Sequence, residues 1–408
     1  MALTDRFVLP AGSVLQPVSE LPEKVRREIG SQDGDFVLSW PQSRSRARVI
    51  DADAAELVRE FQQPATIAQA VARFSKGKAV VPERILDDAL PMLQSLLDAG
   101  FLVAPDSDEA RQIRPTLETG EEVNGWSILR CVQTMHDTEV YQTRGPLSDF
   151  GALKIARSNL GSVRLAIERE AAILGDLDGS VTPRLLASGD WASRPYVLME
   201  WLQGGDAQLA CAELRHRNDL DARRSLHRLT GSVLKAYAHL HEQGIVHGDV
   251  HARNILIERN DTVRILDLGL AEPISKTARN GASLRGGVGF FLEPEFARAQ
   301  QENVPLPPVT SVAEQYSLAA LLYLLITGAH YLDFSLEKTE MLRQIAGESM
   351  LPFAHRGLGA WPDLERLLAK ALSKDPKDRF SSVSEFAACW RDARVPQSSA
   401  RAASRDDE

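Results

Sequence analysis

The sequence has very little cysteine, with only Cys131, Cys211 and Cys389 in 408 residues. Three scattered cysteines cannot build the disulfide framework of a small secreted protein, and their spacing does not match a zinc knuckle. A reducing compartment therefore fits the sequence best. We expect the three side chains to be buried among apolar residues.

The sequence also lacks a secretory leader and a membrane-spanning run. Its start, MALTDRFVLP, has no basic stretch followed by an apolar run. The most apolar stretch, Leu318 to Ile326, is far shorter than the roughly 20 residues needed to cross a bilayer, so it predicts a buried core helix. We predict a cytoplasmic protein with no membrane partner.

Positive charge is in the minority, since 47 Lys and Arg face 56 Asp and Glu. The net charge of −9 and the pI near 5.6 argue against a surface that attracts nucleic acid, so no nucleic-acid partner is expected. A content of 44% hydrophobic and 25% charged residues is typical of globular proteins. The chain is long enough for two or three domains.

Two polar strings stand between apolar stretches: HGDVHARN at residues 247–254 and DLG at residues 267–269. Their apolar flanks place the polar residues at strand ends, where the backbone can direct them into a cleft. Phosphoryl transfer needs a carboxylate near the attacking hydroxyl and oxygen ligands for magnesium. Asp249, Asn254 and Asp267 could supply both.

The two strings resemble the catalytic loop and the metal-binding loop of the protein kinase superfamily, which read HRDLxxxN and DFG. The resemblance implies that Asp249 orients or deprotonates the substrate hydroxyl, and that Asn254 and Asp267 hold Mg2+ beside ATP. Gly269 would let the second loop turn. The alternative is a polar turn between two strands, and the fixed spacing and order argue against it.

Upstream, Phe150 to Ala156 (FGALKIA) resembles the VAIK strand of the same family. The resemblance implies that Ala152 lines the adenine pocket and that Lys154 contacts the nucleotide phosphates. The helical stretch VRLAIEREAAIL then offers Glu170 as the ion-pair partner of the lysine, with Glu168 as the competing choice.

The stretch YVLMEWLQGGD resembles the connection between the two kinase lobes. Met199 would stand at the back of the adenine pocket, and the backbone from Glu200 to Leu202 would hydrogen-bond the base. Gly204 and Gly205 would permit a turn. The resemblance also implies that Val140, in the preceding strand pair, covers the nucleotide.

Downstream, Pro294 and Glu295 match the end of the family's APE motif, and Arg379 matches the arginine that pairs with this glutamate. The stretch EQYSLAALLYLLITG resembles the central helix of the large lobe, although Glu314 replaces the expected aspartate. These features favour the protein-kinase branch over small-molecule phosphotransferases such as aminoglycoside kinases.

The sequence departs from the family in the strand pair WSILRCVQTMHDTEVYQTR, which has no glycine. Aligned on Val140, the three expected glycines fall on Gln133, Met135 and Thr138. Close approach of the backbone to a phosphate is therefore sterically harder. Either ATP binds more weakly or the loop stands off from it.

The catalytic loop itself has further departures. Gly248 replaces the arginine that reads an activating phosphate, which predicts that the activation-segment residues are not obligatory phosphorylation sites; these are Ser275, Thr277 and Ser283. Val288 replaces the threonine that hydrogen-bonds the catalytic acid. His251 stands where Ser/Thr kinases carry lysine and Arg253 where tyrosine kinases carry arginine, so either could steady the transferred phosphate and the acceptor type stays open.

The first part of the chain shows a short strand (RARVID) and helices that begin at Asp53, Thr66 and Pro82, the last ending at Gly100. This order resembles PqqD-like winged-helix domains, which serve as leader-peptide recognition elements in ribosomal peptide modification. A plain accessory domain is the alternative. DNA binding is disfavoured because the third helix is acidic.

These patterns predict an α+β protein, a bilobal protein-kinase-like fold preceded by a small winged-helix-like domain. We predict transfer of the γ-phosphate of ATP to a Ser or Thr hydroxyl of a protein or peptide, with a pseudokinase scaffold as the alternative. The predicted parts are an N-terminal segment, the winged-helix-like domain, a linker, the kinase-like domain and a disordered tail, at residues 1–35, 36–104, 105–124, 125–395 and 396–408.

Overall fold

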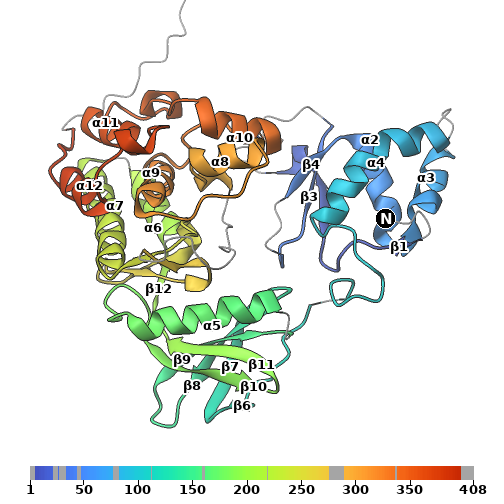
Figure 1. The fold of residues 1–408 in the computed structure, drawn as a ribbon, viewed down its shortest axis with the longest axis horizontal. Helices are drawn as coiled ribbons and strands as arrows, with labels where there is room; N and C mark the ends of the chain where they lie inside the picture. The colour runs from blue at the N-terminus through green and yellow to red at the C-terminus, as the bar shows by residue number, and fades with distance from the viewer. Residues whose placement is uncertain are drawn as a thin grey trace, which may run out of the picture. The chain divides into compact units, whose positions relative to one another are not determined.

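The computed structural model describes residues 5–21, 26, 34–43, 47–76, 82–111, 113–158, 161–217, 219–274, 289–335 and 338–396. The predictions for Ser275, Thr277, Ser283 and Val288, and for nearly all of the tail, lie outside these residues. The chain divides into two compact units (Figure 1). The first holds Met1–Ser148 and Lys154–Ser158, and the second holds Asp149–Leu153 and Asn159–Glu408.

The first unit opens with short strands and three helices. β2, β3 and β4 form an antiparallel sheet in that order, and β1 pairs with β5. The elements are β1 (Arg6–Phe7), β2 (Val14–Pro17), β3 (Phe36–Ser39), β4 (Arg48–Ile50), α2 (Ala52–Arg59), β5 (Ala65–Thr66), α3 (Ile67–Ser75) and α4 (Pro82–Asp98).

Capping side chains set the helix boundaries in this region. Asp51 accepts a hydrogen bond from the backbone N–H of Ala54 and so begins α2 slightly earlier than the sequence predicts. Thr66 and Gln69 form a reciprocal capping box at α3, as its predicted start implies. Gly100, with φ of +75°, ends α4.

One hydrophobic core holds this part of the chain together, and we call this part the front domain (residues 5–111). The core is built from β3, β4 and the three helices, with Phe61 and Phe101 completely buried. Phe7 and Leu9, which precede the predicted domain, pack against the same core, and Ile113 from the predicted linker joins it. Residues on both sides of 36–104 therefore stabilise the front domain.

The rest of the first unit is an antiparallel meander of β6 (Glu122–Val123), β7 (Trp126–Thr134) and β8 (Thr138–Arg144). A short turn joins β7 to β8, and Thr134 pairs with Glu139 across it. β9 (Phe150–Ala156) crosses the boundary between the units, so Lys154 goes with the first and Ala152 with the second.

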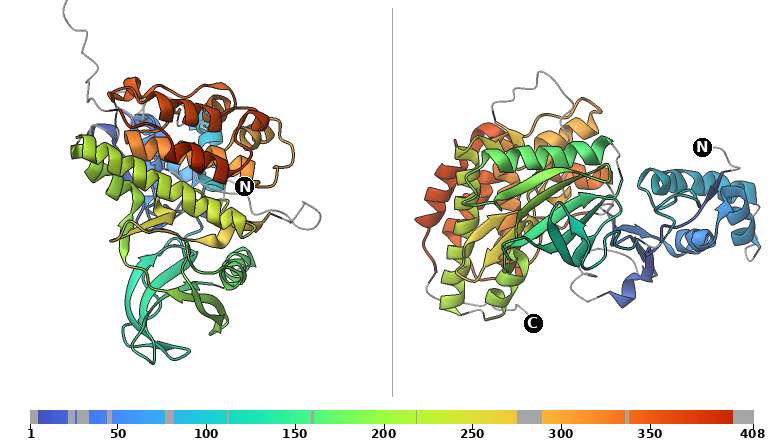
Figure 2. Two further views of the ribbon diagram at one scale, coloured as in Figure 1. Left: turned by 90° about the vertical axis from the view of Figure 1, so that its left-hand side faces the viewer. Right: turned by 90° about the horizontal axis from the view of Figure 1, so that it is seen from below.

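In the second unit, α5 (Gly161–Asp176) packs on the hairpin of β10 (Leu185–Trp191) and β11 (Arg194–Glu200). Helices follow in the rest of this unit, and α6, α7, α11 and α12 among them pack against α9, with α7 beside α12 (Figure 2). They are α6 (Ala207–Arg217), α7 (Leu220–Glu242), α8 (Pro294–Gln301), α9 (Ser311–Thr327), α10 (Lys338–Gly347), α11 (Pro362–Ala371) and α12 (Val383–Arg391).

α9 confirms the predicted core helix, since every residue from Leu318 to Ile326 is buried. Thr310 caps its start and Gly328, with φ of +80°, ends it. Among the residues that the structure describes, no helix has both the length and the apolar character needed to cross a bilayer.

Short strands carry the polar loops of the second unit. β12 (Gly204–Asp206), β14 (Ile255–Glu258) and β15 (Val263–Ile265) form one sheet, and β13 (Ile245–Val246) pairs with β16 (Glu272–Pro273). The prediction of a turn at Gly204 is wrong, because this residue is in a strand. A Cβ there would overlap the carbonyl of Ile257, so the two backbones can approach only at a glycine.

All three cysteines are free thiols. Cys211 is completely buried, as expected, and burial raises its pKa to about 12. Cys131 and Cys389 are only partly buried, so the expectation is wrong for these two.

Candidate active site

The catalytic loop follows β13 and is closed by its own asparagine. Asn254 donates from Nδ2 to the carbonyl oxygen of Asp249 at 3.0 Å, and the same nitrogen lies 3.4 Å from Asp249 Oδ2. The five-residue spacing seen in the sequence thus folds both side chains into one turn. Since Nδ2 is the donor, Oδ1 of Asn254 is left as the acceptor of the amide.

The carboxylate of Asp249 has one engaged oxygen and one unengaged oxygen. Oδ2 lies 3.5 Å from Nε2 of His251. Oδ1 is buried and has no hydrogen-bond partner in the described part of the chain. Burial tends to raise the pKa of Asp249, but His251 and His247 outweigh it and the pKa lies below its ordinary value. Asp249 is therefore an ionised acceptor with a free oxygen, as a substrate hydroxyl requires.

His247 connects this loop to the strand before Asp267. Its Nδ1 accepts from the backbone N–H of Asp249 at 3.2 Å, so the proton sits on Nε2, which donates to the carbonyl of Leu266 at 2.9 Å. The backbone N–H of Leu266 in turn donates to the carbonyl of Asn254. With both ring nitrogens engaged by the backbone, His247 fixes the position of the loop.

Asp267 has a left-handed backbone, with φ of 59° and ψ of 76°. An aspartate in this region is uncommon and costs about 1 kcal/mol or more, and such strain concentrates at functional sites. The sequence predicted that Gly269 makes the turn, but Asp267 itself adopts the left-handed conformation. The turn continues into η4 (Leu268–Leu270), where the backbone N–H of Leu268 donates to Glu170 at 3.3 Å.

Burial favours Glu170 over Glu168 as the partner of Lys154. The side chain of Glu168 is 53% exposed and forms an ion pair with Arg164, one helical turn earlier on α5. Glu170 is only 1% exposed and lies against η4. Lys154, in the other unit, is 7% exposed. A buried charge requires a partner, so the pairing of Lys154 with Glu170 stays a prediction with a physical reason.

The carboxylate of Glu314 binds the backbone of the catalytic loop. Its carboxylate accepts from the backbone N–H groups of His247 and Gly248 at 3.2 and 2.7 Å and lies 2.8 Å from Nε2 of His241. Burial raises the pKa of Glu314, but the bond and charge of His241 lead the groups that lower it below its usual value. The longer side chain that replaces the family's aspartate is therefore accommodated. His241 was missed in the sequence, where nothing links it to Glu314.

Gly248 is the position where the family carries arginine, and here the backbone requires glycine. Its φ is +77°, and a Cβ would lie 2.7 Å from the carbonyl oxygen of Leu270. We expect Gly248→Ala to lower the free energy of unfolding by about 2 kcal/mol or more and to lower kcat, because the loop must move. Thermal unfolding and label transfer from ATP measure the two effects.

Gly244→Ala is the matched control for this substitution. Gly244 has a similar φ of +82°, but a Cβ there meets nothing within 4 Å. It therefore reports the backbone strain without the clash. Equal effects of the two substitutions would contradict the role assigned to the contact with Leu270.

The connection after β11 offers fewer hydrogen-bonding groups than predicted. Met199, the predicted back of the adenine pocket, is buried. The N–H of Glu200 donates to the carbonyl of Arg184 at 2.9 Å, and the N–H of Trp201 lies 3.3 Å from the carbonyl of Phe150. The N–H of Glu200 is therefore engaged and only its carbonyl is left for a base, while the predicted contact of the Leu202 backbone stays a prediction.

For four other predicted site residues the structure gives the position and does not test the role. Val140 on β8 and Ala152 on β9 are partly buried. Nδ1 of His251 accepts a hydrogen bond from the backbone N–H of Arg253 at 3.2 Å. The side chain of Arg253 takes no part in this bond, and the residue is exposed. Contacts of these four side chains with nucleotide or phosphate stay predictions.

The ion pair predicted beneath the substrate platform is present. Arg379 donates to both oxygens of Glu295, at 2.9 and 2.7 Å. The guanidinium also donates to the carbonyls of Val312 and Ser373, both at 3.0 Å, and its side chain is completely buried. Pro294 occupies the first turn of α8. The pairing of Glu295 with Arg379 is therefore confirmed.

A magnesium ion at this site would rely on few protein ligands. Among the described residues there is no group of three or more His, Cys, Asp and Glu side chains with metal-binding geometry. The carboxylate of Asp267 and the amide oxygen of Asn254 are hard oxygen ligands of the kind that Mg2+ prefers. Mg2+ usually completes its shell with phosphates and water, so two protein ligands fit this ion.

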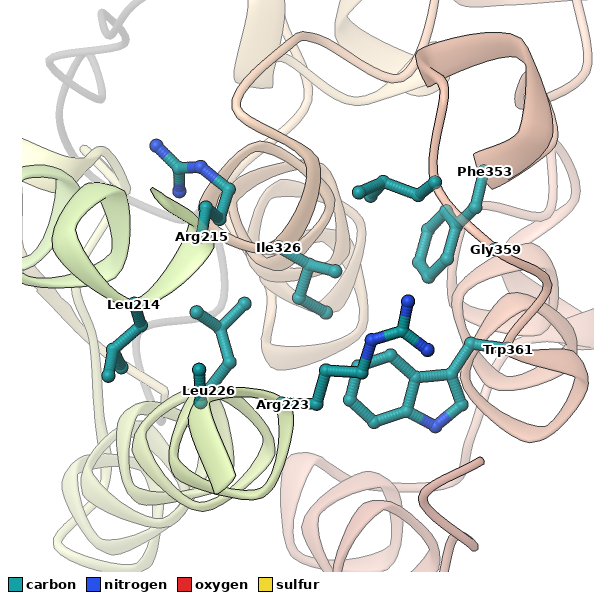
Figure 3. A pocket seen from close by; sticks show the side chains of 10 residues that line it. Leu214, Arg215, Arg223, Leu226, Ile326, Phe353, Gly359 and Trp361 are labelled. Carbon is teal, nitrogen blue, oxygen red and sulfur yellow. The ribbon is translucent and has the colours of Figure 1, made fainter. Parts of the chain in front are cut away.

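A pocket of about 40 Å³ lies elsewhere in the second unit (Figure 3). Leu226 of α7, Ile326 of α9 and Trp361 contribute to its mostly apolar wall, with Arg215 and Arg223 at its side. It has room for a few water molecules and not for a nucleotide. None of the catalytic-loop residues lines it.

Comparisons with known proteins agree with this geometry. The protein kinase domain family matches residues 138–390. The serine/threonine-protein kinase PknB of Mycolicibacterium smegmatis is 26% identical over 247 residues, which cover 58% of this chain and 37% of that protein. PknJ of Mycobacterium tuberculosis is 28% identical over 282 residues, 66% of this chain and 46% of that protein.

The chain therefore spans less than half the length of these relatives. The solved kinase domain of Mycobacterium tuberculosis PknI aligns with 68% of this chain and 99% of its own, at 20% identity and a TM-score of 0.48. The family match covers more than half of the chain and includes Lys154, the catalytic loop and the Glu295–Arg379 pair. The chain belongs to the protein kinase domain family.

Proposed function

We propose that this protein is a kinase that transfers the γ-phosphate of ATP, with Mg2+, to a serine or threonine hydroxyl of a protein or peptide. The observation that carries the proposal is the buried Oδ1 of an ionised Asp249, which has no partner among the described residues. A buried acceptor without a donor costs free energy and is typical of a site that receives a substrate group. The relatives in which the same domain occurs are named serine/threonine-protein kinases.

In this proposal each side chain has one task. Asp249 accepts a hydrogen bond from the substrate hydroxyl and orients it. Asn254 and Asp267 present oxygens to Mg2+, which neutralises charge on the phosphates. Lys154 adds a cation to the phosphates, and Arg253 or His251 steadies the transferred group.

The test is label transfer by the purified full chain from γ-labelled ATP with Mg2+ to itself and to generic protein acceptors. Acid hydrolysis of the products then identifies the labelled amino acid. We expect phosphoserine or phosphothreonine. Label on tyrosine alone would overturn the acceptor assignment.

A pseudokinase that binds nucleotide without turnover is the second candidate. The feature that favours it is the absence of glycine between Gln133 and Thr138. Nucleotide binding with no transfer to any acceptor would establish this candidate over the first. The presence of Lys154, Asp249, Asn254 and Asp267 together argues for turnover.

For the front domain we propose a PqqD-like role, the capture of a leader peptide as an added strand. In the part of the chain that the structure describes, β4 has a partner strand on one side only. Nε of Arg48 on this strand is buried and has no partner among the described residues. An arriving peptide carbonyl or carboxylate would satisfy it.

Titration of the full chain with synthetic precursor peptides encoded beside its gene tests this role. Arg48→Ala is expected to weaken binding about tenfold, since it removes one charged hydrogen bond. Arg84→Ala, an exposed arginine on α4, is the control. Equal binding by both variants would exclude β4 as the peptide site.

We also propose a cytoplasmic location, because three free thiols suit a reducing compartment. Cell fractionation checks it, and recovery in an exported fraction would contradict it.

A further inference from the structure

The turn between β7 and β8 is where the family carries its glycine-rich loop, and we call residues Gln133–Thr138 the phosphate loop. The N–H of Met135 donates to the carbonyl of Thr138 at 2.8 Å, which makes a tight hairpin turn. No residue of the phosphate loop has a positive φ. A loop without glycine has few alternative backbone conformations, so its shape is restricted. Its position is then set by the residues that contact it.

The front domain holds the tip of this loop. The backbone N–H of His136 donates to the carbonyl of Gln42 at 2.9 Å. The ring of His136 lies against the indole of Trp40, with 5.6 Å between ring centroids. Trp40 is 4% exposed and belongs to the hydrophobic core of the front domain. The loop is therefore attached to a residue that is itself fixed by packing.

A second attachment connects the loop to the strand that carries Lys154. The N–H of Arg157 donates to the carbonyl of Asp137 at 2.9 Å. The guanidinium of Arg157 forms an ion pair with Glu139, which is completely buried at the start of β8. Arg157 follows Lys154 closely in the chain, and both belong to the same compact unit as the front domain.

The predicted linker reinforces these attachments. Ile113 lies in the core of the front domain. Arg157 donates to the carbonyl of Arg114 at 2.8 Å. Thr116 donates from its N–H and its hydroxyl to Glu139, at 3.0 and 2.6 Å. The segment from Ile113 to Thr116 therefore packs on β8 and is not a flexible linker between two domains.

We propose that the front domain is a structural part of the nucleotide site, with Trp40 and Gln42 as positioning residues for the glycine-free phosphate loop. Because the backbone N–H of His136 donates to Gln42, this N–H is not available to a phosphate, and the bond instead keeps the loop in place. Through Arg157 the same attachment orients the strand of Lys154. A loop that is already ordered loses less conformational entropy when a ligand binds. The inference rests on the proposed function.

Steady-state kinetics of the full chain with varied ATP tests the inference. His136→Pro removes the N–H that donates to Gln42, and Trp40→Phe weakens the ring contact while keeping an aromatic residue in the core. We expect either substitution to raise KM for ATP about fivefold to tenfold and to change kcat by less than about twofold. Trp126→Phe, at the far end of β7, is the matched control and leaves both values unchanged.

Amide hydrogen exchange shows whether each variant has released the loop. We expect faster exchange for residues 133–138 in both variants and not in the control. A released loop with unchanged KM would overturn the inference, and so would a lowered KM, which would make the contact inhibitory. If wild type binds ATP but transfers no phosphate, the proposed turnover fails. The inference is then tested by comparing the Kd for ATP of wild type, the two variants and the control.

Discussion

We expect Asp249→Asn to lower kcat for the proposed phosphate transfer about a thousandfold and to leave the fold intact. The substitution keeps the shape of the side chain but removes the charge that would attract the substrate proton, and a positioned acid or base contributes about 100-fold to 10,000-fold. The introduced amide would also place an NH2 group near His251 or in the buried position that Oδ1 of Asp249 occupies. A donor there would oppose the hydroxyl proton of the substrate. Label transfer at saturating ATP measures the effect.

The matched control for this substitution is Asp261→Asn. Asp261 lies at the turn between β14 and β15 with φ of 61°, a conformation that asparagine also tolerates, and it pairs with Arg228 at the surface. We expect unchanged kcat for the control and similar thermal stability for both variants. Activity of Asp249→Asn close to wild type would refute phosphate transfer through Asp249. It would not affect the membership in the family.

We expect Arg379→Ala to lower the free energy of unfolding by about 3 to 5 kcal/mol. The arginine is completely buried and donates to Glu295 and to two backbone carbonyls, so its removal leaves a carboxylate and two acceptors without donors. Breaking a buried ion pair from one side has a cost of this size. Denaturant unfolding followed by tryptophan fluorescence measures it.

Arg343→Ala provides the comparison. Arg343 also forms two ion pairs, with Glu340 and Glu348, but its side chain is 56% exposed. Water and salt screen exposed ion pairs, so we expect the free energy of unfolding of this variant to stay close to that of wild type. A loss for Arg379→Ala no larger than that of Arg343→Ala would mean that the Glu295 pair is not a principal support of the substrate platform.

The turn at the centre of the candidate site could be predicted from local sequence, whereas the roles of its residues stay predictions. Asp249 and Asn254 are close in the chain, so their spacing alone encodes the turn that joins them. Glu295 and Arg379 are 84 residues apart, and only the resemblance to kinases predicted that they meet. Burial then favours Glu170 over Glu168, which no helical pattern on α5 could do, and the pairing of Glu170 with Lys154 stays a prediction.

Other features could not be predicted because they depend on distant partners. A glycine pair after an apolar strand usually indicates a turn, but Gly204 serves the close approach of Ile257. The stretch 105–124 is polar and lacks periodic apolar residues, and this pattern indicates a linker. Its order comes from Glu139 and Tyr141, which bond Thr116 and Leu117 from a distant part of the chain.

This docked stretch determines where the chain can be cut. A fragment that begins at residue 125, the predicted start of the kinase domain, would lack Thr116 and Leu117, which bond Glu139 and the hydroxyl of Tyr141. Glu139 would keep only Arg157 and its neighbour Tyr141 as donors among the described residues. Trimming an apparent tether would therefore remove part of the interior of the catalytic domain.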